Sequence, residues 1–363
     1  MMPIPEQILA AVQTVTDPNT AQDFVSTKAL KNLNVNDGDV SFDVVLGYPA
    51  NSQIPGLRKA LIAAAKSVAG VQNVSVNMTV KIESHAVQRG VQLLPNVKNI
   101  VAVASGKGGV GKSTTAVNLA LALAAEGASV GLLDADIYGP SIPMMMGIAG
   151  RPESEDGKTM EPMENYGVQV MSIGFLVNQD EAMIWRGPMV TQALEQLLRQ
   201  TNWKDLDYLI VDLPPGTGDI QLTLSQRVPM TGAVIVTTPQ DIALLDAKKG
   251  IKMFEKVGVP ILGIVENMAV HVCSNCGHVE HIFGEGGGKR MAAERDMAYL
   301  GALPLALQIR LQADGGKPTV VADPEGDVAG IYKAVARQVA VAIAAKNKDV
   351  TSKFPSIKIS KST

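Results

Sequence analysis

The spacing of apolar residues changes near residue 99, and the two parts of the chain predict different kinds of fold. Before that point, short alternating stretches suit strands, while Leu57, Leu61 and Val68 mark one face of a longer helical stretch. The predicted elements are a helix over 5–16, strands over 29–33 and 40–46, a helix over 54–68 and a strand over 74–80. Residues 1–83 therefore predict a small α+β domain, followed by a linker over 84–98.

From residue 99 onward, short apolar runs alternate with helical stretches. The runs lie at 100–104, 130–133, 168–171, 208–211, 233–236 and 261–265, and the clearest helices at 114–125, 189–198 and 327–345. Strands that alternate with helices form right-handed βαβ units and hence a parallel sheet. The predicted fold is a doubly wound, mostly parallel α/β sheet over 99–345 beside the small α+β domain, with 346–363 as a frayed tail.

Composition and charge exclude several classes of protein. The 363 residues are 46% hydrophobic and 18% charged, which is ample material for a large core. A net charge of −3 gives no electrostatic argument for nucleic acid as a partner. No apolar run approaches the roughly 20 residues that span a bilayer, and the first residues lack the pattern of a signal peptide. We therefore expect a cytoplasmic protein with no membrane partner.

One segment carries the pattern of a phosphate-binding loop. The run Gly106-Lys107-Gly108-Gly109-Val110-Gly111-Lys112-Ser113 fits G-x-x-x-x-G-K-S/T, between an apolar strand and a helix. Glycines let the backbone wrap closely around phosphate, so that amide N–H groups and the start of the helix face the anion. Lys112 is predicted to contact the β- and γ-phosphates of ATP, and the Ser113 hydroxyl to bind Mg²⁺.

A second lysine in this loop, Lys107, has two interpretations. It cannot easily share the same phosphate oxygens with Lys112 from the same side. It could instead reach a nucleotide across a dimer interface, as an arginine finger does. The alternative is a solvated loop lysine.

Acidic residues follow two of the predicted strands. Asp134 and Asp136 come directly after the run 130–133, and Asp212 ends the run that starts at 208. The carboxyl ends of parallel strands meet at one edge of a sheet, where nucleotides bind. Asp212 has the form expected for a Mg²⁺ ligand, and the Pro- and Gly-rich loop 213–219 after it could sense the γ-phosphate.

The segment from Ser105 to Thr114 resembles the deviant phosphate loop of the family that contains MinD, ParA and nitrogenase iron protein. Two further segments, 134–141 (DADIYGPS) and 212–219 (DLPPGTGD), are similar to one branch, the Mrp/ApbC-type iron–sulfur cluster carrier ATPases. The resemblance covers about residues 99–345. It implies ATP-dependent dimers in which Lys107 acts in trans, Asp136 positions the attacking water and Asn267 contacts adenine.

The only two cysteines of the chain, Cys273 and Cys276, form one Cys-x-x-Cys among three histidines. Such a pair can hold one metal ion or one edge of a cluster, but it cannot complete a four-thiolate site. A two-fold dimer brings two pairs together. That geometry resembles the bridging [4Fe-4S] cluster of the carrier family, half of which each subunit supplies.

Three other interpretations of the cysteine pair stay open. A mononuclear zinc could take His278 or His281 as further ligands, and spacing alone leaves zinc and iron–sulfur nearly level. The remaining two are a dithiol–disulfide couple and inert cysteines.

The N-terminal part is similar to the small domain of iron–sulfur assembly proteins that is fused ahead of many bacterial Mrp-type ATPases. The similarity rests on Leu46-Gly47-Tyr48-Pro49-Ala50, the helix that follows and Val68-Ala69-Gly70-Val71-Gln72-Asn73. That family usually has a cysteine shortly after the Pro-Ala pair, where this chain has Asn51. The departure argues against a cluster held by this domain and leaves a docking or scaffold role.

The sequence thus favours an ATP-hydrolysing carrier that binds a cluster as a homodimer and passes it to apo iron–sulfur proteins, in company with cluster-assembly scaffold proteins. A first alternative is a positioning ATPase like MinD or ParA. A second is an ATPase with a structural or regulatory zinc at the Cys-x-x-Cys.

Overall fold

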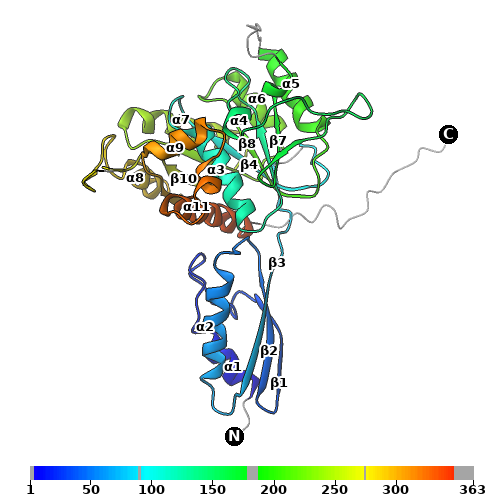
Figure 1. Cartoon of the computed structure of the whole chain (residues 1–363), viewed down its shortest axis with the longest axis vertical. Coiled ribbons are helices and arrows are strands. Elements are labelled where there is room, and N and C mark those ends of the chain that lie inside the picture. The colour runs from blue at the N-terminus through cyan, green and yellow to red at the C-terminus, as the bar shows by residue number, and fades with distance from the viewer. Residues whose placement is uncertain (1–3, 89–90, 178–186, 274, 347–363) are drawn as a thin grey trace, which may run out of the picture.

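The computed structural model describes residues 4–88, 91–177, 187–273 and 275–346. The chain forms two units, with the smaller N-terminal domain attached below the larger domain in the view of Figure 1. The predicted tail over 346–363 lies outside the described residues except for Lys346. In the described ranges, no helix is long and apolar enough to cross a membrane.

The N-terminal domain packs two helices on one three-stranded sheet. Its elements are α1 (Pro5–Val12), β1 (Leu30–Asn36), β2 (Asp39–Leu46), α2 (Ile54–Lys66) and β3 (Asn73–Val80). The sheet order is β1-β2-β3, with β1 antiparallel and β3 parallel to β2. Alternate β2 residues, Val40, Phe42 and Val44, are buried in the core. All five predicted elements are present, four of them within about three residues of the predicted bounds.

The first helix is shorter than predicted and ends at Val12. The Thr14 hydroxyl donates to the Ala11 carbonyl, and the Asp17 carboxylate accepts from the Asn19 backbone N–H. Such local side-chain bonds compete with helix propagation. Residues after Val12 therefore turn into a loop that returns toward the sheet.

The larger domain is built on an eight-stranded sheet in the order β13-β10-β9-β4-β8-β5-β7-β6. Its strands are β4 (Val97–Ala104), β5 (Val130–Asp134), β6 (Met163–Asn165), β7 (Val168–Ser172), β8 (Leu206–Asp212), β9 (Gly232–Thr237), β10 (Ile261–Glu266) and β13 (Tyr299–Ala302). Only β6 pairs antiparallel; the other pairs are parallel. The predicted fold class is confirmed, with β6 and β13 as short edge strands that were not predicted.

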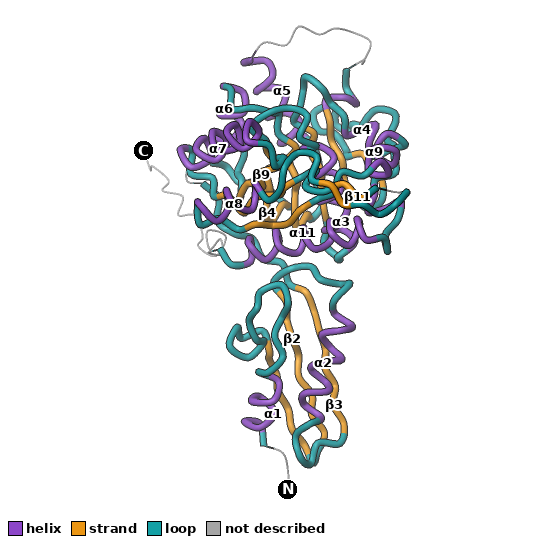
Figure 2. The backbone as a smooth tube through the Cα atoms, turned by 90° about the vertical axis from the view of Figure 1, so that its left-hand side faces the viewer, coloured by secondary structure: helices purple, strands orange, loops and turns teal. Residues whose placement is uncertain are grey.

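Helices cover both faces of this sheet (Figures 1 and 2). The helices are α3 (Lys112–Ala125), α4 (Ile142–Met145), α5 (Gly187–Gln200), α6 (Asp219–Arg227), α7 (Asp241–Lys256), α8 (Gly287–Glu294), α9 (Leu307–Asp314), α10 (Thr319–Ala322) and α11 (Asp327–Ala344). The adjacent pair α3 and α11 lies toward the N-terminal domain, while α5, α6 and α7 lie on the opposite side. The sheet is therefore buried on both faces, as its continuous apolar strands predict.

A buried ion pair of the larger domain, between Glu126 at the end of α3 and Arg337 on α11, anchors the N-terminal domain through hydrogen bonds to Ser52 and Asn19. Arg337 Nη1 lies 2.5 Å from Glu126 Oε1, and the Glu126 side chain is fully buried. The Glu126 carboxylate also accepts from the Ser52 backbone N–H at 2.9 Å and from the Ser52 hydroxyl at 2.6 Å. Helix α3 thus runs from the predicted phosphate loop at its start to the N-terminal domain at its end.

Candidate functional site: phosphate loop and cysteine hairpin

The predicted phosphate loop connects β4 to α3. Gly111 precedes the helix with φ +80°, and Gly109 has φ +82°, both in the left-handed region that favours glycine. A Cβ on Gly106 would lie 2.1 Å from the Asp246 backbone carbon, so a side chain has no room there. Gly111, the residue directly before α3, has no side chain that could cap the N–H groups of the helix. The loop therefore leaves the helix start open to an anion, as the motif predicts.

Lys112, Ser113 and Asp212 converge at this helix start. Lys112 Nζ lies 2.6 Å from Asp212 Oδ1 and 3.2 Å from Ser113 Oγ. Lys112 is nearly buried and Asp212 is fully buried. Burial raises the pKa of the Asp212 carboxyl, and the Lys112 ammonium opposes that shift. Within the described residues, Asp212 Oδ2 is buried without a hydrogen-bond partner.

The unpaired oxygen of Asp212 fits a bound Mg²⁺. Carboxylate and hydroxyl oxygens are the ligands that Mg²⁺ takes, usually together with retained waters and phosphate oxygens. Asp212 Oδ2 and Ser113 Oγ supply one oxygen of each kind beside Lys112. The donor set present in the chain therefore agrees with the predicted Mg²⁺ ligands.

The two carboxylates after β5 have different surroundings. Asp134 is fully buried and accepts from the Ser172 hydroxyl at 3.0 Å and from the Ile142 N–H at 3.3 Å. Burial and the nearby Asp212 raise the pKa of Asp134 to about 7. Asp136 keeps 16% of its side chain exposed, and its Oδ2 lies 3.9 Å from Lys112 Nζ. Asp134 therefore braces the loop, and of the two carboxylates after β5 only Asp136 faces Lys112 and the site.

Asn267 packs against the phosphate loop, and Lys107 is part of it. The Asn267 side-chain amide donates to the Val110 carbonyl at 2.8 Å, which fixes the end of β10 against the loop. Lys107 is half-buried, and no carboxylate of the described chain lies within ion-pair distance of it. The Ser105 hydroxyl donates to the Lys107 carbonyl at 2.9 Å and holds its backbone. The adenine contact of Asn267 and the trans role of Lys107 stay predictions.

The loop after Asp212 is hydrogen-bonded to β4 and to Ser105, the residue directly before the phosphate loop. The Gly216 N–H donates to the Ser105 carbonyl at 3.0 Å, and the Leu213 N–H donates to the Val103 carbonyl at 3.1 Å. Gly216 has φ +98°, a conformation that glycine allows. Helix α6 begins three residues after this turn, at Asp219. A structural change at the bound phosphates would therefore reach α6 through the hydrogen bond between Ser105 and Gly216.

The cysteines lie at the tip of a small hairpin formed by β11 (His271–Val272) and β12 (Val279–Glu280). Cys273 is half-buried, Cys276 is exposed, and both are free thiols. The Gly277 N–H donates to the Cys273 carbonyl at 2.8 Å, which closes the turn. Hydrogen bonds from the backbone of Asn275 and Cys276 lower the pKa of Cys273. The turn thus favours the thiolate, the form that binds metals.

The histidines near the hairpin have other partners. His271 Nδ1 lies 2.9 Å from the Leu305 carbonyl oxygen, and His281 Nδ1 lies 2.9 Å from the Ala269 carbonyl oxygen. His278 is exposed beside Glu280, with 3.6 Å between Nε2 and Oε1. Across the described ranges, no three Cys, His, Asp or Glu side chains are grouped so that they could hold a metal. One chain therefore offers two thiols and no assembled third ligand.

Glu266, which was not predicted, links the end of β10 to the start of α8. It ends β10 with 2% of its surface exposed, and its carboxylate accepts from the Gly288 N–H in the first turn of α8. Asn267 follows directly, and the hairpin begins at His271. The sequence signal that could have identified Glu266 is a charged residue at the end of an apolar strand. The segment from Glu266 to Cys273 is the shortest covalent path between the two halves of the site.

Residues 96–340 match the family described as NUBPL iron-transfer P-loop NTPase. The match spans more than half of the chain and includes the phosphate loop, Asp212 and both cysteines. The chain belongs to this family. Residues 5–77 match a second family, described as iron-sulfur cluster assembly protein. The resemblance found in the sequence is confirmed for both parts of the chain.

Relatives from bacteria and animals are similar over most of this chain. It is 52% identical over 324 residues to an iron-sulfur cluster carrier protein of Salmonella typhimurium, covering 89% of this chain and 88% of that one. It is 61% identical over 275 residues to a protein of the same description from Pseudomonas fragi, covering 75% and 96%. It is 55% identical over 248 residues to the mouse iron-sulfur cluster transfer protein NUBPL, covering 68% and 78%.

Solved structures share the fold of the larger domain. A nucleotide-binding protein of Archaeoglobus fulgidus in complex with ADP has a TM-score of 0.56 and 38% identity, covering 64% of this chain and 90% of that one. The cell division ATPase MinD of Pyrococcus furiosus has a TM-score of 0.50 and 21% identity, covering 66% and 98%. The MinD similarity shows the fold alone.

Proposed function

We propose that this protein is an ATP-hydrolysing iron–sulfur cluster carrier that transfers a cluster to apo-proteins. The observation that carries the proposal is the hairpin with Cys273 and Cys276. Its thiols are accessible, and it starts only four residues after Asn267, whose side chain is hydrogen-bonded to the phosphate loop. A site for cargo should be exposed, whereas a structural metal is normally enclosed by four ligands. The names of the relatives, carrier and transfer proteins, support the same function.

In the proposed reaction the phosphate loop binds ATP, and Ser113 and Asp212 hold Mg²⁺. The metal ion would neutralise charge that develops on the phosphate oxygens. Lys112 now pairs with Asp212, so nucleotide binding requires its ammonium to turn toward the β- and γ-phosphates. Asp136 orients the attacking water from its partly exposed position, and Asn267 contacts adenine. Thr114, in the first turn of α3, is the last of the residues proposed to bind the nucleotide.

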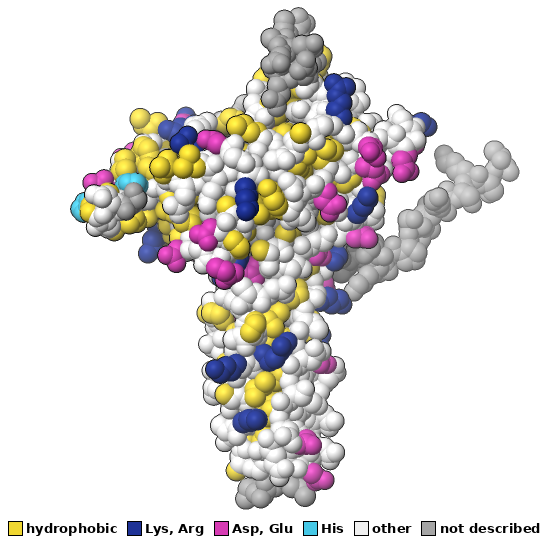
Figure 3. All heavy atoms as spheres, in the orientation of Figure 1, with side chains coloured by type: hydrophobic (Ala, Val, Ile, Leu, Met, Phe, Trp, Pro, Cys, Tyr) yellow, Lys and Arg dark blue, Asp and Glu magenta, His cyan; other side chains and the backbone are white. Residues whose placement is uncertain are grey.

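The proposed active form is a homodimer. Two thiols per chain leave a cluster half ligated, and a second copy related by a two-fold axis supplies the other two for a bridging [4Fe-4S] cluster. Figure 3 shows hydrophobic side chains gathered near α7, α9 and the hairpin. Exposed apolar residues in this region include Val272, Val279, Ile282, Leu307 and Leu311. A surface of this kind is typical of a protein interface. In such a dimer Lys107 would reach the partner's nucleotide.

Anaerobic reconstitution followed by iron and sulfide analysis tests the proposal. We expect about two iron and two sulfide per chain in dimers, because a Cys₄ site binds one four-iron cluster per pair of chains. Cys273→Ala and Cys276→Ala should each lose the cluster but retain ATP binding. His278→Ala, on the same hairpin, is the matched control and should retain the cluster. Stoichiometric zinc with no iron would point to a zinc site and refute the carrier function while leaving the ATPase intact.

A further inference from the structure

A cavity of about 550 Å³ lies where the N-terminal domain meets the end of α11. The N-terminal domain supplies most of its wall, and Val341, Ala344 and Ala345 of α11 close one side. Phe24 and Leu46 contribute buried apolar surface. None of the lining residues belongs to the phosphate loop or to the cysteine hairpin, and nothing in the proposed reaction uses the cavity.

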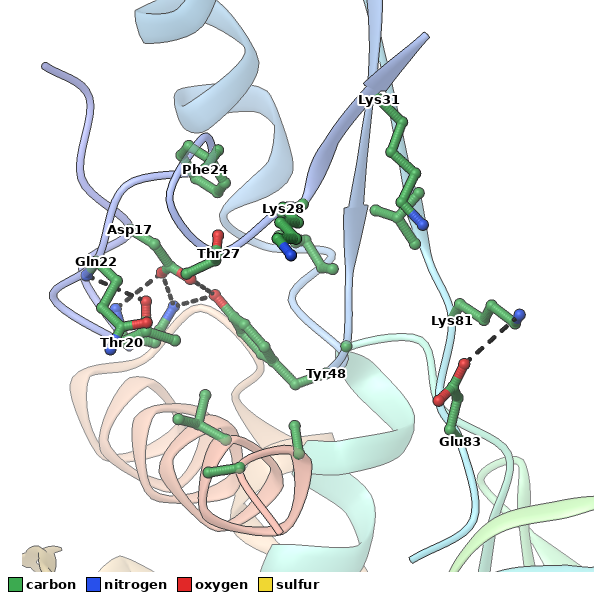
Figure 4. A pocket seen from close by; sticks show the side chains of 18 of the residues that line it. Asp17, Thr20, Gln22, Phe24, Thr27, Lys28, Lys31, Tyr48, Lys81 and Glu83 are labelled. Atoms are coloured by element: carbon green, nitrogen blue, oxygen red, sulfur yellow. Dashed lines mark hydrogen bonds and ion pairs between the residues drawn. The ribbon is translucent and has the colours of Figure 1, made fainter. Parts of the chain in front are cut away.

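Three lysines surround the mouth of this cavity (Figure 4). Lys28 comes from the loop before β1, Lys31 from β1 and Lys81 from the end of β3. All three are exposed. Lys81 Nζ lies 3.6 Å from Glu83 Oε1, whereas no carboxylate in the described part of the chain lies within ion-pair distance of Lys28 or Lys31. The cluster stands out because the whole chain carries a net charge of −3.

The acidic residue at the opposite end of the cavity is already satisfied. The Asp17 carboxylate accepts from the Tyr48 hydroxyl at 2.6 Å and from the Asn19 side-chain amide at 3.2 Å. Figure 4 shows this group on the side of the cavity away from Lys31 and Lys81, with Lys28 between them. Glu83 is paired with Lys81, so within the described residues the charges at the mouth without an ion-pair partner are the ammonium groups of Lys28 and Lys31.

The interior combines an apolar wall, to which Phe24 and Leu46 contribute, with hydrogen-bonding side chains such as Gln22 and Thr27, and flexible charged side chains form the rim. This combination suits a protein segment better than a small anion. Protein interfaces bury an apolar centre and leave charges at a solvated rim. A small-anion site would instead direct buried donors at the ligand. We propose that this cavity, the lysine-rimmed pocket, binds a linear acidic segment of a partner protein, with one apolar side chain inside and carboxylates at Lys28 and Lys31.

The chain's own C-terminal residues are a poorer occupant. They begin beside the pocket, because Ala345 is part of its wall. Residues 347–363 contain four lysines and one aspartate, so they would bring positive charge to a positive rim. Complementary charge favours a separate acidic partner.

Selection from a random 12-residue peptide library displayed on phage, against the full-length protein, tests the proposal. We expect selected peptides to be enriched in Asp and Glu around an apolar residue. Fluorescence anisotropy of the synthesised peptides should show at least tenfold weaker binding to Lys28→Glu/Lys31→Glu. The matched control is Lys59→Glu/Lys66→Glu, which reverses two exposed lysines on α2 of the same domain and should change binding less than twofold. Ala345→Trp, which narrows the mouth without changing charge, should also weaken binding.

Three results would overturn the proposal. One is selection of peptides with no acidic enrichment, and another is equal binding to the two lysine variants. The third is binding that appears only in a chain ending at Lys346, because the native tail would then be the occupant. Unchanged ATP affinity in each variant shows that the larger domain is intact.

Discussion

The pair Arg337–Glu126 lies within the larger domain, but the N-terminal domain covers it and bonds to both residues through Ser52 and Asn19, so we predict that it controls how firmly the two domains hold together. Glu126 follows α3 and is fully buried, and Arg337 on α11 provides its positive partner at 2.5 Å. Arg337 Nη1 also donates to the Ser52 hydroxyl at 3.2 Å, and Arg337 Nε to the Asn19 side-chain oxygen at 3.3 Å. The substitution Arg337→Met keeps much of the side-chain volume and removes the charge.

We expect this substitution to destabilise the domain junction by about 3–5 kcal/mol, the usual cost of leaving one member of a buried pair without its partner. At roughly 1.4 kcal/mol for each factor of ten, opening of the junction becomes at least about a hundredfold more frequent. The two hydrogen bonds that Ser52 donates to Glu126 remain, so a cost near the lower limit is expected.

Hydrogen exchange at two amides reports this opening. The Asn51 N–H donates to the Glu126 carbonyl at 3.2 Å, and the Ser52 N–H donates to the Glu126 carboxylate at 2.9 Å. Both amides belong to the N-terminal domain, so they lose these partners when the domains separate. Exchange followed by mass spectrometry on peptides spanning residues 50–53 should show the loss of protection.

The control is Lys333→Met, one turn earlier on α11. Lys333 Nζ lies 3.8 Å from Glu325, whose side chain is 94% exposed, so this pair contributes about 0–1 kcal/mol. The double variant Glu126→Gln/Arg337→Met should recover part of the lost protection, because no charge is then left unpaired. If Arg337→Met and Lys333→Met exchange at the same rate, the ion pair does not hold the junction and the reasoning is wrong.

Three further predictions concern the site. Lys112→Met should abolish ATP hydrolysis and lower thermal stability more at pH 8 than at pH 5. Without Lys112, burial is the largest influence left on the pKa of Asp212, opposed only by the Ser113 hydrogen bond. The folded pKa is raised above the unfolded one, so stability falls as pH rises between the two values. Gly106→Ala should cost stability and ATP binding, since its Cβ would meet the Asp246 backbone at 2.1 Å. Cys273 should react with iodoacetamide at a pH below that of an ordinary thiol, as mass spectrometry can follow, because its pKa is lowered.

Each of these predictions has a control in the same protein. Lys107→Met removes a half-buried lysine of the same loop and should leave thermal stability unchanged at both pH values. A Cβ on Gly108 would meet nothing within 4 Å, so Gly108→Ala should be tolerated. In urea, the alkylation profile of Cys273 should return to that of an ordinary thiol. Equal stability of the two glycine variants, or an unchanged Cys273 profile in urea, would contradict the structural explanation.

Local patterns in the sequence determined much of the fold and the nucleotide site. The parallel sheet followed from apolar runs alternating with helical stretches, because burial on both faces requires continuous apolar strands. The phosphate loop followed from glycine spacing, and its φ values of +82° at Gly109 and +80° at Gly111 show why glycine is needed there. The edge strands β6 and β13 were missed because they are three and four residues long. Segments of this length are too short to show a periodic pattern of apolar residues.

Tertiary structure decided what depends on residues far apart in the chain. Spacing alone leaves Asp134 and Asp136 equivalent, and only the family resemblance singled out Asp136; contacts with Ser172 and Ile142 bury the first and leave the second facing Lys112. The sequence left His281 open as a metal ligand, whereas its Nδ1 lies 2.9 Å from the Ala269 carbonyl oxygen. Glu126 and Arg337 are 211 residues apart, and no local pattern pairs them. Propensity and periodicity are properties of neighbouring residues, whereas burial and partner choice are set by packing between distant ones.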